Sequence, residues 1–165
     1  MKRVFSLLLS LCLIGGVMAQ EPLPAKKIMK DAYDQATKEN KQVMVIFHAS
    51  WCGWCHRMDS IMNMPTVKPM FDKYFVIKHI VVLESAKKKN LENPGGDQLM
   101  KKFNGAGSGI PYWVILDAKG KILGDSRMPT KNKAGKDIKS NVGCPAQPNE
   151  IEYFIGLLKK TTSLS

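Results

Sequence analysis

The order of apolar patterns along the chain predicts an α/β domain whose central mixed β-sheet is flanked by helices on both faces. Two short, nearly continuous apolar runs, QVMVIFHA (42–49) and FVIKHIVVL (75–83), are typical of strands that are buried on both faces. Segments with apolar residues at helical spacing alternate with these runs. The segment YWVILDAKGKILGDS (112–126) has a turn at its centre and favours a β-hairpin.

The first half of the chain predicts a helix, a strand and a second helix. The first helix follows a proline-rich opening, and its apolar stripe consists of Ile28, Met29, Ala32, Tyr33 and Ala36. After the first strand the pattern becomes helical from Gly53, and Pro65 ends or kinks that helix. We expect its core face to carry Trp54, Met58, Ile61 and Met62.

The second half contains three shorter helical patterns and two polar stretches. Residues 65–75 and 97–104 favour helices, whereas 85–96 favours a polar loop. Residues 126–147 are rich in Lys, Gly, Asn and Pro, and we expect a long polar loop there, either functional or mobile. A closing helix should follow, with Asn149 and Glu152 at its start. Its core face should carry Ile151, Phe154, Ile155 and Leu158.

The amino terminus, MKRVFSLLLSLCLIGGVMAQ, has the features of a secretory signal peptide. Two basic residues precede an apolar run that is shorter than the roughly 20 residues of a membrane span, and VMA precedes Gln20 as a cleavage site. An uncleaved anchor is the alternative, and Leu11 argues against lipidation at Cys12. We therefore predict a signal peptide at 1–19, one domain at 20–165, and a periplasmic or secreted protein cleaved near Ala19.

The charge of the chain is strongly basic, with 25 Lys and Arg against 14 Asp and Glu and a net charge of +11. Most of the excess is lysine in polar stretches, and Arg57 and Arg127 are the only arginines after residue 3. Nucleic-acid readers more often cluster arginine with aromatic residues. The composition favours a solvated basic surface with some attraction to anionic partners or lipid headgroups. We expect a monomer with no nucleic-acid partner.

The segment IFHASWCGWCHRM (46–58) carries two cysteines three residues apart, a spacing that three chemistries use. The pair can cycle between dithiol and disulfide, hold a metal ion, or attach haem through the CxxCH pattern. Export would remove Cys12 and leave Cys52, Cys55 and Cys144. An odd count with one close pair favours a reactive pair over a structural framework.

The position of the pair assigns a role to each thiol. A strand that runs directly into a helix places Cys52 at the helix N-terminus, where free N–H groups and the helix dipole stabilise a thiolate. Cys52 is then the predicted attacking thiol. Cys55, one turn later, should lie deeper and resolve the mixed disulfide formed at Cys52.

The segment VMVIFHASWCGWCHRM resembles the active-site strand, turn and helix of the thioredoxin superfamily, and GSGIPYWVILDAKGKIL resembles its cis-proline turn and hairpin. The similarity extends over about residues 26–160 and is greatest to exported single-domain members with a WCGWC centre. It implies a thioredoxin fold and a disulfide oxidoreductase, with Trp51, Gly53, Trp54 and His56 beside the redox pair. It also implies that Ile110 pairs through its backbone with an extended substrate, next to Pro111 in the cis-proline position.

The same resemblance implies what the protein works with. It implies no cofactor beyond the dithiol or disulfide of Cys52 and Cys55, cysteine-containing protein substrates, and a redox partner that recycles the pair. Two departures leave the direction of electron flow open. Ile46 occupies the position of a buried carboxylate that serves the resolving thiol in relatives, and Trp54 precedes the second cysteine where relatives carry proline.

Three alternatives accompany this prediction. Haem attachment is disfavoured because a buried strand precedes the motif and a hairpin follows. A copper binding or delivery module would use Cys52, Cys55 and His56, with help from a methionine. A thioredoxin-like binding module would seldom cycle its cysteine pair between dithiol and disulfide.

Three interpretations are open for Cys144: a third redox thiol, an intermolecular bridge, or a small buried residue. The base rate for unpaired cysteines favours the last.

Overall fold

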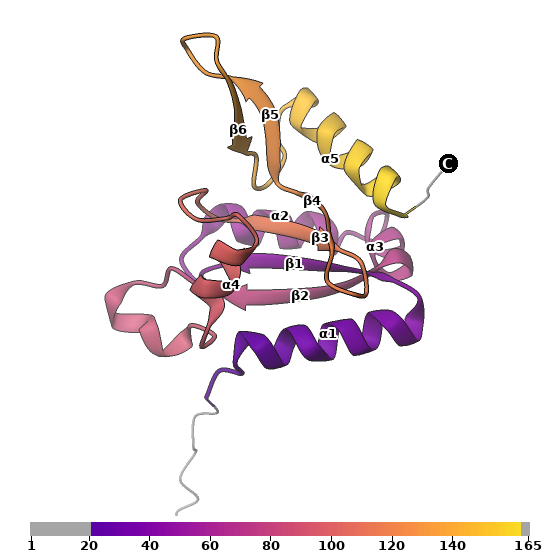
Figure 1. Ribbon diagram of the computed structural model, residues 1–165, viewed down its shortest axis with the longest axis vertical. Coiled ribbons are helices and arrows are strands. Elements are labelled where there is room, and N and C mark those ends of the chain that lie inside the picture. The colour runs from indigo at the N-terminus through magenta and orange to yellow at the C-terminus, as the bar shows by residue number, and fades with distance from the viewer. Residues whose placement is uncertain (1–20, 163–165) are drawn as a thin grey trace, which may run out of the picture.

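The computed structural model describes residues 21–162, which form one sheet, a separate hairpin and the helices around them (Figure 1). The predicted signal peptide lies outside the described residues. The elements in chain order are α1 (Ala25–Glu39), β1 (Gln42–His48), α2 (Gly53–Met62), α3 (Lys68–Tyr74), β2 (Phe75–Val81), the 3-10 helix η1 (Ala86–Leu91), α4 (Gly96–Lys102), β3 (Tyr112–Leu116), β4 (Ile122–Asp125), β5 (Arg127–Lys131), β6 (Asp137–Asn141) and α5 (Pro148–Thr162).

The central sheet has the strand order β2-β1-β3-β4, with β1 parallel to β2 and antiparallel to β3. The β3–β4 pair is antiparallel and closes the predicted hairpin. The apolar runs therefore form the mixed sheet that the sequence predicted, and the fold is the thioredoxin fold.

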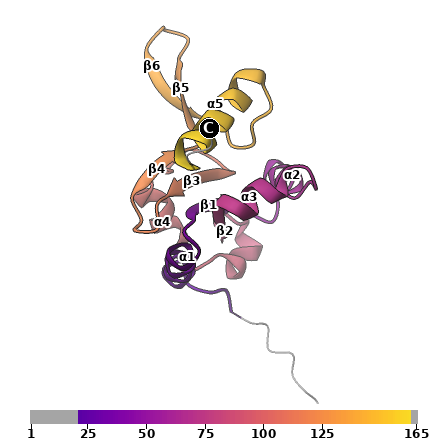
Figure 2. The same ribbon diagram turned by 90° about the vertical axis from the view of Figure 1, so that its right-hand side faces the viewer.

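Alternate side chains of β1 point to opposite faces of the sheet and build two cores. Val43, Val45 and Phe47 pack with residues of α1 and α4. Met44 and Ile46 pack with residues of α2, α3 and α5. Figures 1 and 2 show α1 and α5 on opposite sides of the sheet, so β1 is covered on both faces.

The polar stretch expected as a long loop at 126–147 instead contains the two-stranded β5–β6 sheet, so that prediction needs correction. Asn132 turns the chain, because its Oδ1 accepts the N–H groups of Ala134 and Lys136 at 3.0 Å each. No residue of either strand is buried, so no alternation of apolar residues marks them. Figure 1 shows this hairpin projecting from the body beside α5.

Two predicted helix faces are wider than the faces that are buried. In α2, Met58 and Met62 are buried, whereas Trp54 and Ile61 are exposed. In α5, Leu158 is buried, but Ile151 and Ile155 are exposed. The carboxylate of Glu150, rather than Asn149 or Glu152, accepts the N–H groups of Ala146 and Gln147 at the start of α5. Each helix contacts the sheet along a narrow stripe, and the expected isoleucines lie beside that stripe.

Gly105 packs against Tyr112 so closely that we expect Gly105→Ala to destabilise the fold. A Cβ there would lie 2.6 Å from the Tyr112 ring, and the Tyr112 hydroxyl holds the ring by donating to the carbonyl of Phe103 at 2.6 Å. Overpacking of this kind costs about 1–3 kcal/mol of the free energy of unfolding, measured by urea denaturation. Gly156→Ala, an exposed helical site with open space, is the control and should be neutral or stabilising. Equal stability of the two variants would contradict the packing argument.

Candidate active site

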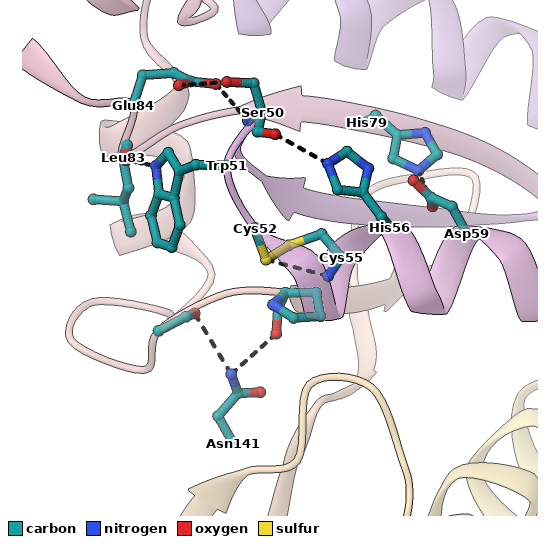
Figure 3. The surroundings of a disulfide bond; sticks show 12 residues. Ser50, Trp51, Cys52, Cys55, His56, Asp59, His79, Leu83, Glu84 and Asn141 are labelled. Atoms are coloured by element: carbon teal, nitrogen blue, oxygen red, sulfur yellow. Dashed lines mark hydrogen bonds and ion pairs between the residues drawn. A yellow bond between two sulfur atoms is a disulfide. The ribbon is translucent and has the colours of Figure 1, made fainter.

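Cys52 and Cys55 form a disulfide at the junction of β1 and α2 (Figure 3). Cys52 is the N-cap residue of α2 in an extended conformation, and Cys55 lies one turn into the helix. The N–H of Cys55 donates to Sγ of Cys52 at 3.2 Å. The backbone carbonyl of Cys52 also accepts from the N–H of His56 at 3.2 Å. The strand therefore delivers Cys52 to the N-terminus of α2, as the sequence predicted.

This position favours negative charge on Cys52 once the disulfide is reduced. A sulfur atom that accepts an N–H at a helix N-terminus lies in the positive end of the helix dipole. Thiols so placed ionise below their ordinary range, and the thiolate is the form that attacks a disulfide. Chemically, the pair can exchange two electrons with another dithiol or disulfide.

The two cysteines are almost equally covered in the disulfide state. Cys52 is 3% exposed and Cys55 is 2% exposed, so burial does not make Cys55 the deeper thiol, contrary to expectation. The flanking tryptophans are open, with Trp51 at 58% and Trp54 at 54% exposure. It is the N-cap position, rather than exposure, that distinguishes Cys52 from its partner.

The four predicted neighbours of the pair surround it in different ways. The indole N–H of Trp51 donates to the carbonyl of Leu83 at 2.9 Å, and the guanidinium of Arg57 lies 5.5 Å from the centre of the Trp54 ring. Gly53 begins α2, and a Cβ added there would meet open space. His56 points away from the disulfide, with Nε2 3.0 Å from the carbonyl oxygen of Ser50 (Figure 3).

Glu84 holds the turn that leads into Cys52, a role that the sequence did not suggest. Its carboxylate accepts both the N–H and, at 3.0 Å, the hydroxyl of Ser50. These hydrogen bonds, the backbone N–H first, lower the pKa of Glu84 although burial opposes the shift. Glu84 is 4% exposed and follows β2, so it reaches the turn from the neighbouring strand.

Ile46, at the position where the resemblance led us to look for a carboxylate, is fully packed in the apolar core on the α2 side of the sheet. On the same side, Nε2 of His79 lies 2.8 Å from Oδ1 of Asp59 on α2, and the His79 ring centre is 5.1 Å from that of His48. Burial tends to raise the pKa of Asp59, but the hydrogen bond and charge of His79 hold it below its ordinary value. The pKa of the half-buried His48 is lowered by burial and by His79.

The Ile110–Pro111 peptide bond is cis, and Ile110 packs against the cluster formed by Ala49, Cys52 and Cys55. The structure thus brings the two predicted substrate-binding residues to the redox pair. Asn141 braces this loop, because its side-chain NH₂ donates to the carbonyls of Ser108 and Pro111 at 3.0 Å each (Figure 3). No sequence pattern marks Asn141, since it acts across 30 residues or more.

Cys144 is a free thiol, 6% exposed, in the same apolar cluster as Trp113 and Leu158. Desolvation by burial raises its pKa. Cys144 is therefore the small buried residue that we expected from the usual burial of unpaired cysteines. Its neighbour Gly143 accepts the indole N–H of Trp113 at 2.8 Å, which fixes the segment on the core.

Residues 21–162 contain no group of three or more His, Cys, Asp or Glu side chains arranged to hold a metal ion. Within the same residues, no helix combines the length and the apolar character needed to cross a membrane.

The chain is similar to known proteins in its sequence and in its fold. A family model described as thioredoxin-like matches residues 25–118, more than half of the chain. A disulphide isomerase from Xylella fastidiosa Temecula1 is similar at a TM-score of 0.52 and 22% identity, over 65% of this chain and 76% of that chain. A structure described as DsbH oxidoreductase is similar at a TM-score of 0.51 and 15% identity, over 91% and 90%. No curated protein matches the chain. At identities of 22% and 15%, the similarity to these solved structures shows a shared fold and nothing more.

We expect Glu84→Gln to destabilise the protein at neutral pH but not in acid. The folded pKa of Glu84 lies below the ordinary 4.5, so its stabilising effect is complete above that value and is lost as the pH falls through the folded pKa. The melting temperature of wild type should exceed that of the variant at pH 7, and the gap should close on acidification. Glu152→Gln on the exposed side of α5 is the control. A gap that is constant with pH would refute the hydrogen-bonded role of Glu84.

We expect Cys144 to be chemically inert in the native protein. Because it is buried and its pKa is raised, an alkylating reagent should modify it far more slowly in the folded than in the unfolded state. Cys144→Ala should keep the redox behaviour of the pair and lower the free energy of unfolding by about 1 kcal/mol through the cavity it leaves. Rapid native labelling would show that Cys144 is accessible after all.

Proposed function

The chain belongs to the thioredoxin-like family, and on that premise we propose that it is a thiol–disulfide oxidoreductase acting on protein cysteines outside the cytoplasm. The observation that carries the proposal is the Cys52–Cys55 disulfide at the N-terminus of α2, beside a cis Ile110–Pro111 bond. Cys52 is the attacking thiol and Cys55 the resolving thiol.

The reaction proceeds by two exchanges at sulfur. In the reduced enzyme, the Cys52 thiolate attacks one sulfur of a substrate disulfide, forms a mixed disulfide and releases the first substrate thiolate. The Cys55 thiolate then attacks Sγ of Cys52 and releases the second. Two electrons pass to the substrate, two protons convert its sulfurs to thiols, and the enzyme is left as the disulfide. The reverse sequence oxidises a substrate dithiol.

The position of Ile110 supports a polypeptide substrate. Ile110 packs against the cluster formed by Ala49, Cys52 and Cys55, so a chain that pairs with its backbone would bring a substrate sulfur to Cys52. Exposed Trp51 and Trp54 flank the pair and offer apolar surface to the residues around that sulfur.

The location and the redox circuit complete the proposal. The signal-like amino terminus supports a periplasmic or secreted enzyme. The chemistry needs no cofactor beyond the dithiol. After each turnover a second dithiol or disulfide must return the pair to its starting state, because the pair transfers only two electrons per cycle. We expect a partner protein to supply that dithiol or disulfide.

The test of this function is disulfide reduction in insulin with dithiothreitol as the terminal reductant. Wild type should accelerate the reaction, and Cys52→Ser should abolish the acceleration because the first exchange needs that thiolate. Cys55→Ser, reduced and then freed of dithiothreitol before it meets insulin, should form the mixed disulfide at Cys52 without resolving it, so a covalent complex should accumulate on a non-reducing gel.

Cys144→Ala is the matched control and should behave as wild type. Equal inactivity of wild type and Cys52→Ser would refute the oxidoreductase and favour a binding module. Tight copper binding by that inactive reduced wild type, lost in Cys52→Ser, would identify the metal-handling alternative.

A further inference from the structure

The β5–β6 hairpin lies between β4 and α5, beyond residues 25–118 that the family model covers. It leaves the central sheet after Asp125 and returns at Asn141 beside the cis-proline loop. The end of the hairpin therefore lies beside the loop whose Ile110 packs against the cysteine cluster, although Asn141 is about 90 residues from Cys52 in sequence.

Several hydrogen bonds fix the base of the hairpin. At one strand, Arg127 pairs with Asp125 through Nη2 and Oδ2 at 2.6 Å, and the Tyr153 hydroxyl donates to the carbonyl of Asp125 at 2.9 Å. At the other, Asn141 donates to the cis-proline loop and accepts from the N–H of Gly143 at 3.1 Å. The hairpin is thus anchored at both strands and keeps a set position relative to the loop.

A groove of about 380 Å³ separates the cis-proline loop from the segment that follows the hairpin. Its lining includes Trp54 and Ile110, and also Asn141 and Gln147 from the end of the hairpin and the segment after it. Glu150 also borders the groove, but its Oε2 already accepts the N–H groups of Ala146 and Gln147. Because Ile110 belongs to the lining, a chain that pairs with its backbone would lie in this groove.

The hairpin is strongly basic. Lys131, Lys133, Lys136 and Lys139 are exposed, and none of them takes part in an ion pair within the described part of the chain. Asp137 is the one carboxylate of the hairpin. Four unpaired cations on a projecting, anchored element attract a chain of opposite charge as it enters the groove.

We propose that the groove binds an extended polypeptide whose reactive cysteine is flanked on one side by Asp or Glu residues, which contact the lysines of the hairpin. This inference rests on the proposed function and adds the substrate class to it. The cis-proline loop aligns the backbone, and the hairpin selects the charge of the flank.

The test compares two synthetic peptides, each carrying one intramolecular disulfide, that differ only in having four Glu or four Lys residues on the flanks. Reduced wild type should exchange with the acidic peptide at a kcat/KM about fivefold above that of the basic peptide in low salt. The preference should fall as the ionic strength rises, because salt screens exposed charges.

The variant K131Q/K133Q/K136Q/K139Q should lose the preference. A matched variant, K26Q/K38Q/K101Q/K102Q, removes the same charge from exposed positions on α1 and α4 and should keep it. Equal loss in both variants, or equal rates with both peptides in wild type, would overturn the proposal.

A second measurement separates this proposal from the proposed function. Peptides with serine in place of cysteine should bind the oxidised protein with the same charge preference, measured as Kd. Binding with the expected preference but no exchange with either disulfide would refute the oxidoreductase and support the acidic-peptide groove. Exchange without any charge preference would support the oxidoreductase and refute the acidic-peptide groove. Loss of binding to anionic phosphatidylglycerol vesicles in the hairpin variant alone, with no peptide preference, would assign the lysines to a membrane surface instead.

Discussion

The hydrogen bond from the N–H of Cys55 to Sγ of Cys52 is the contact on which the rest of the site depends. It exists because a short turn after the end of β1 at His48 leads directly into α2 at Gly53, so that Cys52 becomes the N-cap of that helix. The sheet fixes β1 between β2 and β3, and both faces of β1 are buried. The apolar core therefore sets the place and direction of one sulfur atom, and the helix N-terminus sets its electrostatic environment.

Three other segments converge on that junction. Glu84, which follows β2, accepts a hydrogen bond from the N–H of Ser50. The cis-proline loop packs Ile110 against the cysteine cluster, and Asn141 joins the hairpin to that loop by a hydrogen bond. Each contact crosses from one element to another, so the turn around the disulfide is restrained from several sides. Exposed Trp51 and Trp54 lie outside this restrained centre, where a substrate can meet them.

Much of the fold was predictable because buried strands and amphipathic helices leave periodic apolar patterns in the sequence. The cysteine pair was predictable because its spacing and its position after a strand are local features of the sequence. The β5–β6 hairpin was missed because its exposed strands need no apolar alternation. Glu84 and Asn141 were missed because their bonds to distant backbone groups leave no pattern. Trp54 and Ile61 were misplaced because periodicity gives the direction of a helix face but not the width of its contact.

The most direct test of the central claim is a thiolate titration of Cys52 in the reduced variant Cys55→Ser/Cys144→Ala, expressed from Gln20, where it is the sole thiol. The N–H donor at position 55 and the helix N-terminus are retained in this variant, so the stabilising groups are still present. We expect a pKa well below the ordinary cysteine value of about 8.5. An ordinary pKa would show that the helix N-terminus does not activate this sulfur, and the account would fail.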